Sequence, residues 1–376
     1  EHSKQTFFEF GLLESKFEPT LYYTKARDLV VTTQVDDFLY TGTDEMLQKF
    51  ENFIGSKYLI GSVQKRSFTF SGVQVIQKDS YDINLSQPSL SEMLEIPMSP
   101  QRRKQHEEKA TTLEEGAFRS LNGSLLWFGT QTVPQALYFA SNQASFVTDL
   151  KVKHLKRANA TARYVTRLPS EIKICGMDTQ EMEIHVYTDA SFVPRDSVPY
   201  SREGIIIFKC NRAASKLIAQ PLMWAARKIP RVAKSTFAAE TMAAVDGVDD
   251  GIYLSYIIGE LYKKSVPVYL FVDSKSLVDN INSTHVLAPT EKRLVVYLHS
   301  IKDTVQRQEL HSITWVPRAH QLADALTKDN RDANERLQRT LNEGKIVLPA
   351  PSSAAPILTG VDRARQHTAQ AATKEH

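Results

Sequence analysis

The chain has 376 residues, enough for about two to three domains, and its 42% hydrophobic and 24% charged residues can build ordinary buried cores. A net charge of only +3 excludes binding of nucleic acid through overall positive charge, so any such contact must come from local basic patches. No apolar run approaches the roughly 18 residues of a membrane span, no secretory signal is present, and two distant cysteines indicate a reducing compartment. Because the first residue is Glu1, we expect a fragment or processed piece of a longer reading frame.

Two adjacent aspartates lie between strand-like runs near the N-terminus. Asp36 and Asp37 separate the apolar residues 29–33 from 38–40. Adjacent like charges in a hairpin repel each other, and a bound cation would remove that cost, whereas the simpler interpretation is a solvated turn. A helix with one apolar face, containing Phe50 and Ile54, should follow, and then a strand over residues 67–77.

The middle of the chain is expected to be mostly helical. Residues 96–115 are polar and predict a linker, and a helical stretch should run from 118 to about 146. The helix after it is basic, which fits either contact with a nucleic-acid backbone or an ordinary surface helix. Its basic residues are Lys151, Lys153, Lys156, Arg157, Arg163 and Arg167.

Four acidic residues organise the second half of the chain. Asp189 and Asp273 directly follow the apolar runs 184–188 and 267–272, which predict strands buried in a sheet. Glu240 lies near the start of a predicted helix over 236–262, and Asp324 lies in a short helix-prone piece over 321–328. Further strands are expected over 204–209, 218–224 and 313–316, and another helix over 289–307.

The grouping of these acids predicts a metal site. A carboxylate at the end of a buried strand is costly unless it is paired or binds a cation, and like charges close together raise each other's pKa. Hard divalent cations with oxygen ligands resolve that cost. Two such ions about 3.5–4 Å apart can activate water and stabilise the leaving oxygen in phosphodiester cleavage.

Basic residues precede the Glu240 helix, which Ser235 or Thr236 is expected to cap. They could contact a duplex phosphate backbone beside the acidic site without reading its sequence, and the alternative is a solvated loop. Trp224 and Trp315 are expected in the core. The basic residues are Arg227, Lys228, Arg231 and Lys234.

The strings TDAS, AAETMAA, VDSKSL and WVP…ADALTK, in this order, resemble the ribonuclease H domain of copia-type retrotransposons. The QVDD turn resembles the palm hairpin of their reverse transcriptases, with Gln34 in place of the usual aromatic residue, and Phe70–Val73 resembles the region of the primer grip. The resemblance implies a mixed α/β fold, with a five-stranded ribonuclease H-like sheet flanked by helices. It also implies Mg²⁺-dependent endonucleolytic hydrolysis of the RNA strand of RNA–DNA hybrids.

By the same resemblance, Asp189, Glu240, Asp273 and Asp324 are the catalytic residues and hold two Mg²⁺ ions, which Mn²⁺ can replace. His320 is either a proton-transfer residue or an ordinary surface histidine. Asp36 and Asp37 belong to a polymerase palm whose third aspartate would lie before residue 1, so polymerase activity is expected only of the full-length parent. The partners are hybrid nucleic acid and other products of the polyprotein, with no membrane.

The expected domains are a partial palm over 1–95, a linker and helical thumb or connection region over 96–180, a ribonuclease H domain over 181–330, and a helical extension with a disordered tail over 331–376. The resemblance implies a cytoplasmic protein, including one inside virus-like particles, with access to the nucleus. One alternative is an inactive retrotransposon remnant that still binds nucleic acid. Another is a different ribonuclease H-like nuclease or integrase, which usually carries three acids in another order.

Overall fold

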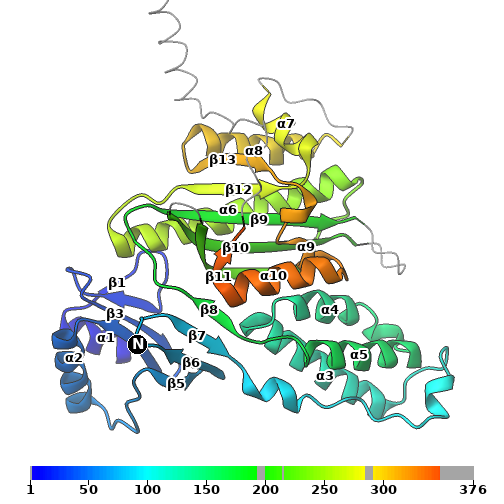
Figure 1. Cartoon of the computed structure of the whole chain (residues 1–376), viewed down its shortest axis with the longest axis horizontal. Helices are drawn as coiled ribbons and strands as arrows, with labels where there is room; N and C mark the ends of the chain where they lie inside the picture. The colour runs from blue at the N-terminus through cyan, green and yellow to red at the C-terminus, as the bar shows by residue number, and fades with distance from the viewer. Residues whose placement is uncertain (1, 193–199, 214–215, 284–290, 348–376) are drawn as a thin grey trace, which may run out of the picture.

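A computed structural model describes residues 2–192, 200–213, 216–283 and 291–347. The described residues form three β-sheets with helices packed against them (Figure 1), so the chain belongs to the mixed α/β class, as predicted. The predicted disordered tail from about residue 348 lies outside the described residues. No helix within the described ranges is long and apolar enough to cross a membrane.

The N-terminal unit is a four-stranded antiparallel sheet with two helices. Phe7 of α1 and Phe50 of α2 are almost fully buried and form its core together with Leu29 and Val31 of β3. The hydroxyl of Thr43 accepts the backbone N–H of Met46 and so caps α2. Its elements are α1 (His2–Phe10), β1 (Leu13–Glu14), β2 (Leu21–Tyr23), β3 (Leu29–Gln34), β4 (Asp37–Gly42) and α2 (Asp44–Lys57).

A second small sheet and three helices make up the middle of the chain. The predicted continuous helix over 118–146 is two helices, α3 and α4, and the break contains Pro134, whose ring cannot continue a helix. The predicted linker is partly structured, because Arg102 pairs with Glu114 in the first turn of α3 at 2.8 Å. The elements are β5 (Ser67–Phe70), β6 (Val73–Gln77), β7 (Ile83–Ser86), α3 (Thr112–Gln131), α4 (Gln135–Ala144), α5 (Val152–Val165) and β8 (Ile172–Ile174).

The largest sheet has the strand order β13-β12-β9-β10-β11-β14. Strands β9, β10 and β11 are antiparallel neighbours, while β12 and β13 run parallel to β9. The sequence predicted five strands, and the sixth, β14, pairs with β11 at the edge. The strands are β9 (Met182–Ser191), β10 (Arg202–Ala213), β11 (Lys216–Lys228), β12 (Val268–Val272), β13 (Leu310–Trp315) and β14 (Lys345–Ile346).

Helices cover both faces of this sheet (Figure 1). One face packs on α6 (Thr236–Tyr262), α7 (Lys275–Asn282) and α8 (Leu294–Gln306), and the other on α9 (Asp324–Thr327) and α10 (Arg331–Glu343). The prediction for α6 is confirmed, including its cap, because Ser235 accepts the N–H of Ala238. Helix α7 was missed, and the predicted helix over 289–307 begins at Leu294, with residues 289–290 outside the described ranges.

The helical middle region docks against the large sheet unit near α10 (Figure 1). The Trp224 indole N–H of β11 donates to the Gly129 carbonyl of α3 at 2.7 Å. Gln135 of α4 donates to Gln338 of α10 at 3.1 Å, and both side chains are buried. These contacts hold the α10 face of the sheet against α3 and α4.

Candidate active site

Asp189 and Asp273 reach the site from the carboxyl ends of two neighbouring parallel strands. Asp189 lies near the end of β9 and is fully buried, and Asp273 directly follows β12. Because β9 and β12 are parallel and paired, their carboxyl ends meet at one edge of the sheet. The two apolar runs in the sequence therefore place both carboxylates side by side.

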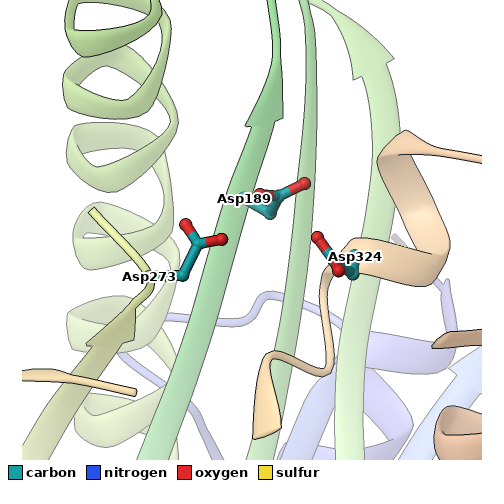
Figure 2. Close-up of side chains that lie close together, drawn as sticks. All are labelled: Asp189, Asp273 and Asp324. Atoms are coloured by element: carbon teal, nitrogen blue, oxygen red, sulfur yellow. The ribbon is translucent and has the colours of Figure 1, made fainter. Parts of the chain in front are cut away.

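Asp324 completes a triad with these two residues. It comes from α9, which packs on the sheet face opposite to the one that α6 covers. It is the first residue of α9 and is 1% exposed. One carboxylate oxygen from each of Asp189, Asp273 and Asp324 lies within 4.8 Å of the other two (Figure 2). Three carboxylates at this spacing are a suitable ligand set for a hard divalent cation.

Glu240 lies beside the triad on α6 but is not part of it. Its carboxylate is buried and accepts the backbone N–H of Ala190, next to Asp189. Burial first, and then the charges of Asp189 and Asp273, raise the pKa of Glu240 well above its usual value. Its Oε2 has no hydrogen-bond partner. A buried acceptor without a partner, next to two other acids, fits a site that receives a cation.

Burial also dominates the electrostatics of Asp189 and Asp273. It raises the pKa of Asp189 to about 7; Lys328 opposes this, and the charges of Asp324 and Asp273 add to it. Burial likewise raises the pKa of Asp273. Carboxylates that resist ionisation in this way gain most from a bound cation.

Sequence reasoning missed three residues that contact the triad. The Lys328 ammonium lies 2.7 Å from Asp324 Oδ1 and 3.1 Å from Asp189 Oδ2. The Thr327 hydroxyl donates to Asp189, and the Arg318 guanidinium lies 3.3 Å from Asp324 Oδ2. The available signal was the i,i+4 spacing of Asp324 and Lys328, which brings the two side chains together on a helical turn.

The other predicted site residues lie in varied settings. Asp36 and Asp37 are exposed at the β3–β4 hairpin, and among the described residues they join no group of three potential metal ligands. His320 is half-buried, and its Nδ1 lies 3.2 Å from the Val347 carbonyl. Trp315 was expected in the core but is 39% exposed, because it ends an edge strand; its indole donates to the Asp273 carbonyl at 3.0 Å.

The four basic residues before α6 differ in how many contacts they make with other side chains of the protein. Arg227 pairs with Glu203 and lies 3.7 Å from Asp246 and 3.6 Å from Asp250. Lys228 lies over the ring of Tyr200, and Arg231 donates to the hydroxyl of Tyr297. Lys234 is exposed. Lys234 is therefore more available to a phosphate backbone than Arg227.

No protein-family model matches the chain, and no curated protein does. Among solved structures, it is similar to the N-terminal RNase H domain of a Mycobacterium tuberculosis protein, at 20% identity over 42% of this chain and 98% of that one, with a TM-score of 0.28. It is similar to RNase H1 from the archaeon Halobacterium salinarum, at 17% identity over 38% and 93%, with a TM-score of 0.27. It is also similar to the foamy viral protease–reverse transcriptase in complex with dsDNA, at 10% identity over 76% and 54%, with a TM-score of 0.36.

Proposed function

We propose that the chain hydrolyses the RNA strand of RNA–DNA hybrids endonucleolytically, with divalent cations, as part of a copia-type retrotransposon polyprotein. The observation that supports this most directly is the convergence of Asp189, Asp273 and Asp324 within 4.8 Å at one edge of a ribonuclease H-like sheet, with buried Glu240 beside them. The four acids lie on four separate segments, and the fold brings them to one place.

Two Mg²⁺ ions, or Mn²⁺ in their place, fit this donor set because it consists of carboxylate oxygens, most of them buried, with one unpartnered acceptor on Glu240. When bound, they supply a nucleophilic water and neutralise charge on the phosphate. Asp189 and Asp273 would hold the ions, and Glu240 and Asp324 would each complete the ligands of one of them. We propose that Glu240 and Asp324 also orient the attacking water, leaving a 3′-hydroxyl and a 5′-phosphate.

The chain's own contacts hold these ligands in place. Thr327 fixes the Asp189 carboxylate, and the Trp315 indole fixes the backbone at Asp273. Because most of the carboxylates are buried, they are poorly solvated and ready to exchange water for a cation. His320, near the start of α9, is the candidate for proton transfer or product release.

We propose that the hybrid is recognised by its shape and its 2′-hydroxyls, not by base edges. Lys234 and Arg231 stand before α6, whose first turns carry Glu240, and are the basic residues best placed to contact the duplex backbone. Arg227 and Lys228 were predicted to contact the duplex as well. Because both already contact other side chains of the protein, we propose that they contribute less to duplex binding.

We assign RNA-directed DNA polymerase activity only to a longer parent chain. Asp36 lies in the turn of a hairpin and Asp37 begins its second strand, and no third carboxylate joins them among the described residues. The setting we propose is the cytoplasm, including virus-like particles.

The test is cleavage of an end-labelled RNA–DNA hybrid by the full chain in Mg²⁺, beside Asp273→Asn. The variant keeps the shape of the side chain and removes a ligand charge, so cleavage should disappear while the fold and hybrid binding remain. RNA–RNA and DNA–DNA duplexes should stay intact. A folded wild-type chain that binds the hybrid and never cuts it would instead identify an inactive remnant.

A further inference from the structure

Lys328 bridges two of the buried acids. It follows the last residue of α9 and is four residues from Asp324. Its ammonium lies 2.7 Å from Asp324 Oδ1 and 3.1 Å from Asp189 Oδ2, and both carboxylates are 1% exposed. Lys328 therefore provides a counter-charge that both carboxylates share, and neither carboxylate has much contact with water.

The other half of the acid cluster has no such cation. Within the described ranges, no lysine, arginine or histidine lies at ion-pair distance from Asp273 or Glu240. Glu240 Oε2 lacks any hydrogen-bond partner. The cluster is thus divided into a side that pairs directly with Lys328, Asp189 with Asp324, and a side that the charge of Lys328 reaches only from beyond ion-pair distance, Asp273 with Glu240.

We propose that Lys328 is a resident cation in the place where Asp189 and Asp324 would hold a second divalent ion. This inference rests on the proposed function. It states that the free protein takes up one divalent ion, on the side of Asp273 and Glu240. A second ion binds only when the ammonium of Lys328 moves out.

Charge and geometry both support this occupancy. The ammonium donates hydrogen bonds to oxygens that a second ion would need. A positive charge about 4 Å from an incoming divalent ion repels it strongly where water is excluded. Lysine suits a removable cation, because its charge is carried on a flexible four-carbon stem and its side chain here is 29% exposed.

The site keeps other support when the lysine is absent. The Thr327 hydroxyl still donates to Asp189, and Arg318 still lies 3.3 Å from Asp324. The backbone of α9 stays packed on the sheet through Leu326, which is fully buried. A Lys328 variant should therefore fold and isolate the effect of the ammonium.

The test is a calorimetric titration of the full chain with Mn²⁺, without nucleic acid. The wild type should bind one ion. Lys328→Met should bind two, the second at least about tenfold more tightly than any second ion on the wild type, since loss of a nearby charge is worth more than this factor. Lys78→Met, which removes an exposed lysine in a distant turn, should behave as the wild type does.

A second measurement covers loss of stability in the variant. Without metal, Lys328→Met and Lys328→Gln should melt at lower temperature than the wild type, because buried Asp189 loses its ion-pair partner and Asp324 keeps only Arg318. Mn²⁺ should raise their melting temperatures more than it raises that of the wild type. Equal shifts in all three proteins would contradict the proposal.

The outcomes separate this inference from the proposed function. One ion on both the wild type and Lys328→Met, with cleavage intact in the wild type, overturns the role of Lys328 and leaves the nuclease standing. Two ions on the free wild type overturn it in the same way. No Mn²⁺ on either folded protein, and no cleavage, overturns both.

Discussion

Gly204 of β10 lies opposite Asp189 of β9, and the space that a side chain at Gly204 would need is filled by α9. A Cβ at Gly204 would lie 2.8 Å from Leu326 Cβ and 2.9 Å from the backbone oxygen of Ala323. Helix α9 carries Asp324, so the missing side chain lets that carboxylate approach Asp189. The glycine is a condition for the triad, although it contributes no ligand.

Gly204→Ala should therefore damage both stability and activity. The added methyl group must push α9 outward, and overpacking of this kind costs about 1–3 kcal/mol of unfolding free energy. Because misplacing a catalytic group by about 1 Å can cost roughly a hundredfold in rate, hybrid cleavage should fall by at least about tenfold. Urea denaturation and hybrid cleavage measure the two effects. Gly176→Ala, where a Cβ meets nothing within 4 Å, is the control, and wild-type cleavage by Gly204→Ala would refute the argument.

Glu203 should make the stability of the protein depend on pH. Burial raises the pKa of Glu203 from its ordinary value of 4.5 to about 7; Arg227 opposes the shift and the charge of Asp246 adds to it. Between about pH 4.5 and 7 the folded state keeps the proton that the unfolded state has lost. Unfolding free energy therefore decreases as pH rises through this window and levels off above it.

Glu203→Gln should remove this contribution. One pKa unit corresponds to about 1.4 kcal/mol of unfolding free energy. The decrease in unfolding free energy from pH 5 to pH 8 should therefore be smaller in the variant by on the order of 2–3 kcal/mol. Solvent screening at half-exposed Arg227 reduces this difference. Urea denaturation at the two pH values measures it. Glu92→Gln, at an exposed position, should leave the pH dependence unchanged. The same drop in Glu203→Gln and the wild type would show that Glu203 does not retain its proton.

The acids at the ends of buried strands could be predicted from the sequence. An apolar run indicates a buried strand, and the residue that follows the run must lie at the end of that strand. Asp189 and Asp273 follow such runs, and parallel pairing of β9 with β12 brings them together. The α/β class and the bounds of α6 follow from the same periodicity and are confirmed. These features could be predicted because the pattern of apolar residues within one segment determines whether that segment forms a helix or a strand.

The remaining features depend on which helices and strands pack against each other, and the periodicity of apolar residues does not show that. Nothing local shows that Gly204 faces α9, or that Lys328 reaches Asp189 across 139 positions of sequence. Trp315 is apolar enough for a core, yet β13 is an edge strand and leaves it 39% exposed. Strand β14 has two residues, too few for any pattern.

Helix α10 should prove essential to the unit built on the six-stranded sheet, although the predicted domain ends at residue 330. Leu337 is fully buried against the same core as Phe208 of β10, so we propose that the unit extends through β14. Leu337→Ala should lower the unfolding free energy by about 2–5 kcal/mol, as buried leucines do. Leu113→Ala, at an 88% exposed helix position, should change it by less than about 0.5 kcal/mol. Equal small effects in urea denaturation would place α10 outside the cooperative unit.

Lys234 and Arg227 should separate binding from stability. Lys234 is exposed, so Lys234→Ala should weaken hybrid binding and reduce the slope of log K against log salt by about one, with unfolding unchanged. Arg227 donates a hydrogen bond to Glu203, whose side chain is 1% exposed. Arg227→Ala should therefore lower stability by about 1–3 kcal/mol, because it leaves a buried acceptor unpaired, and should change the salt slope little.

Fluorescence anisotropy of a labelled hybrid at several salt concentrations gives the slopes, and urea denaturation gives the stabilities. The two variants serve as each other's control, since each removes one positive charge from the same basic segment. If both lost the same affinity and neither lost stability, Arg227 would contact the duplex in spite of its acidic partners. The reach of the nucleic-acid surface would then extend from Lys234 back to the end of β11, which contains Arg227.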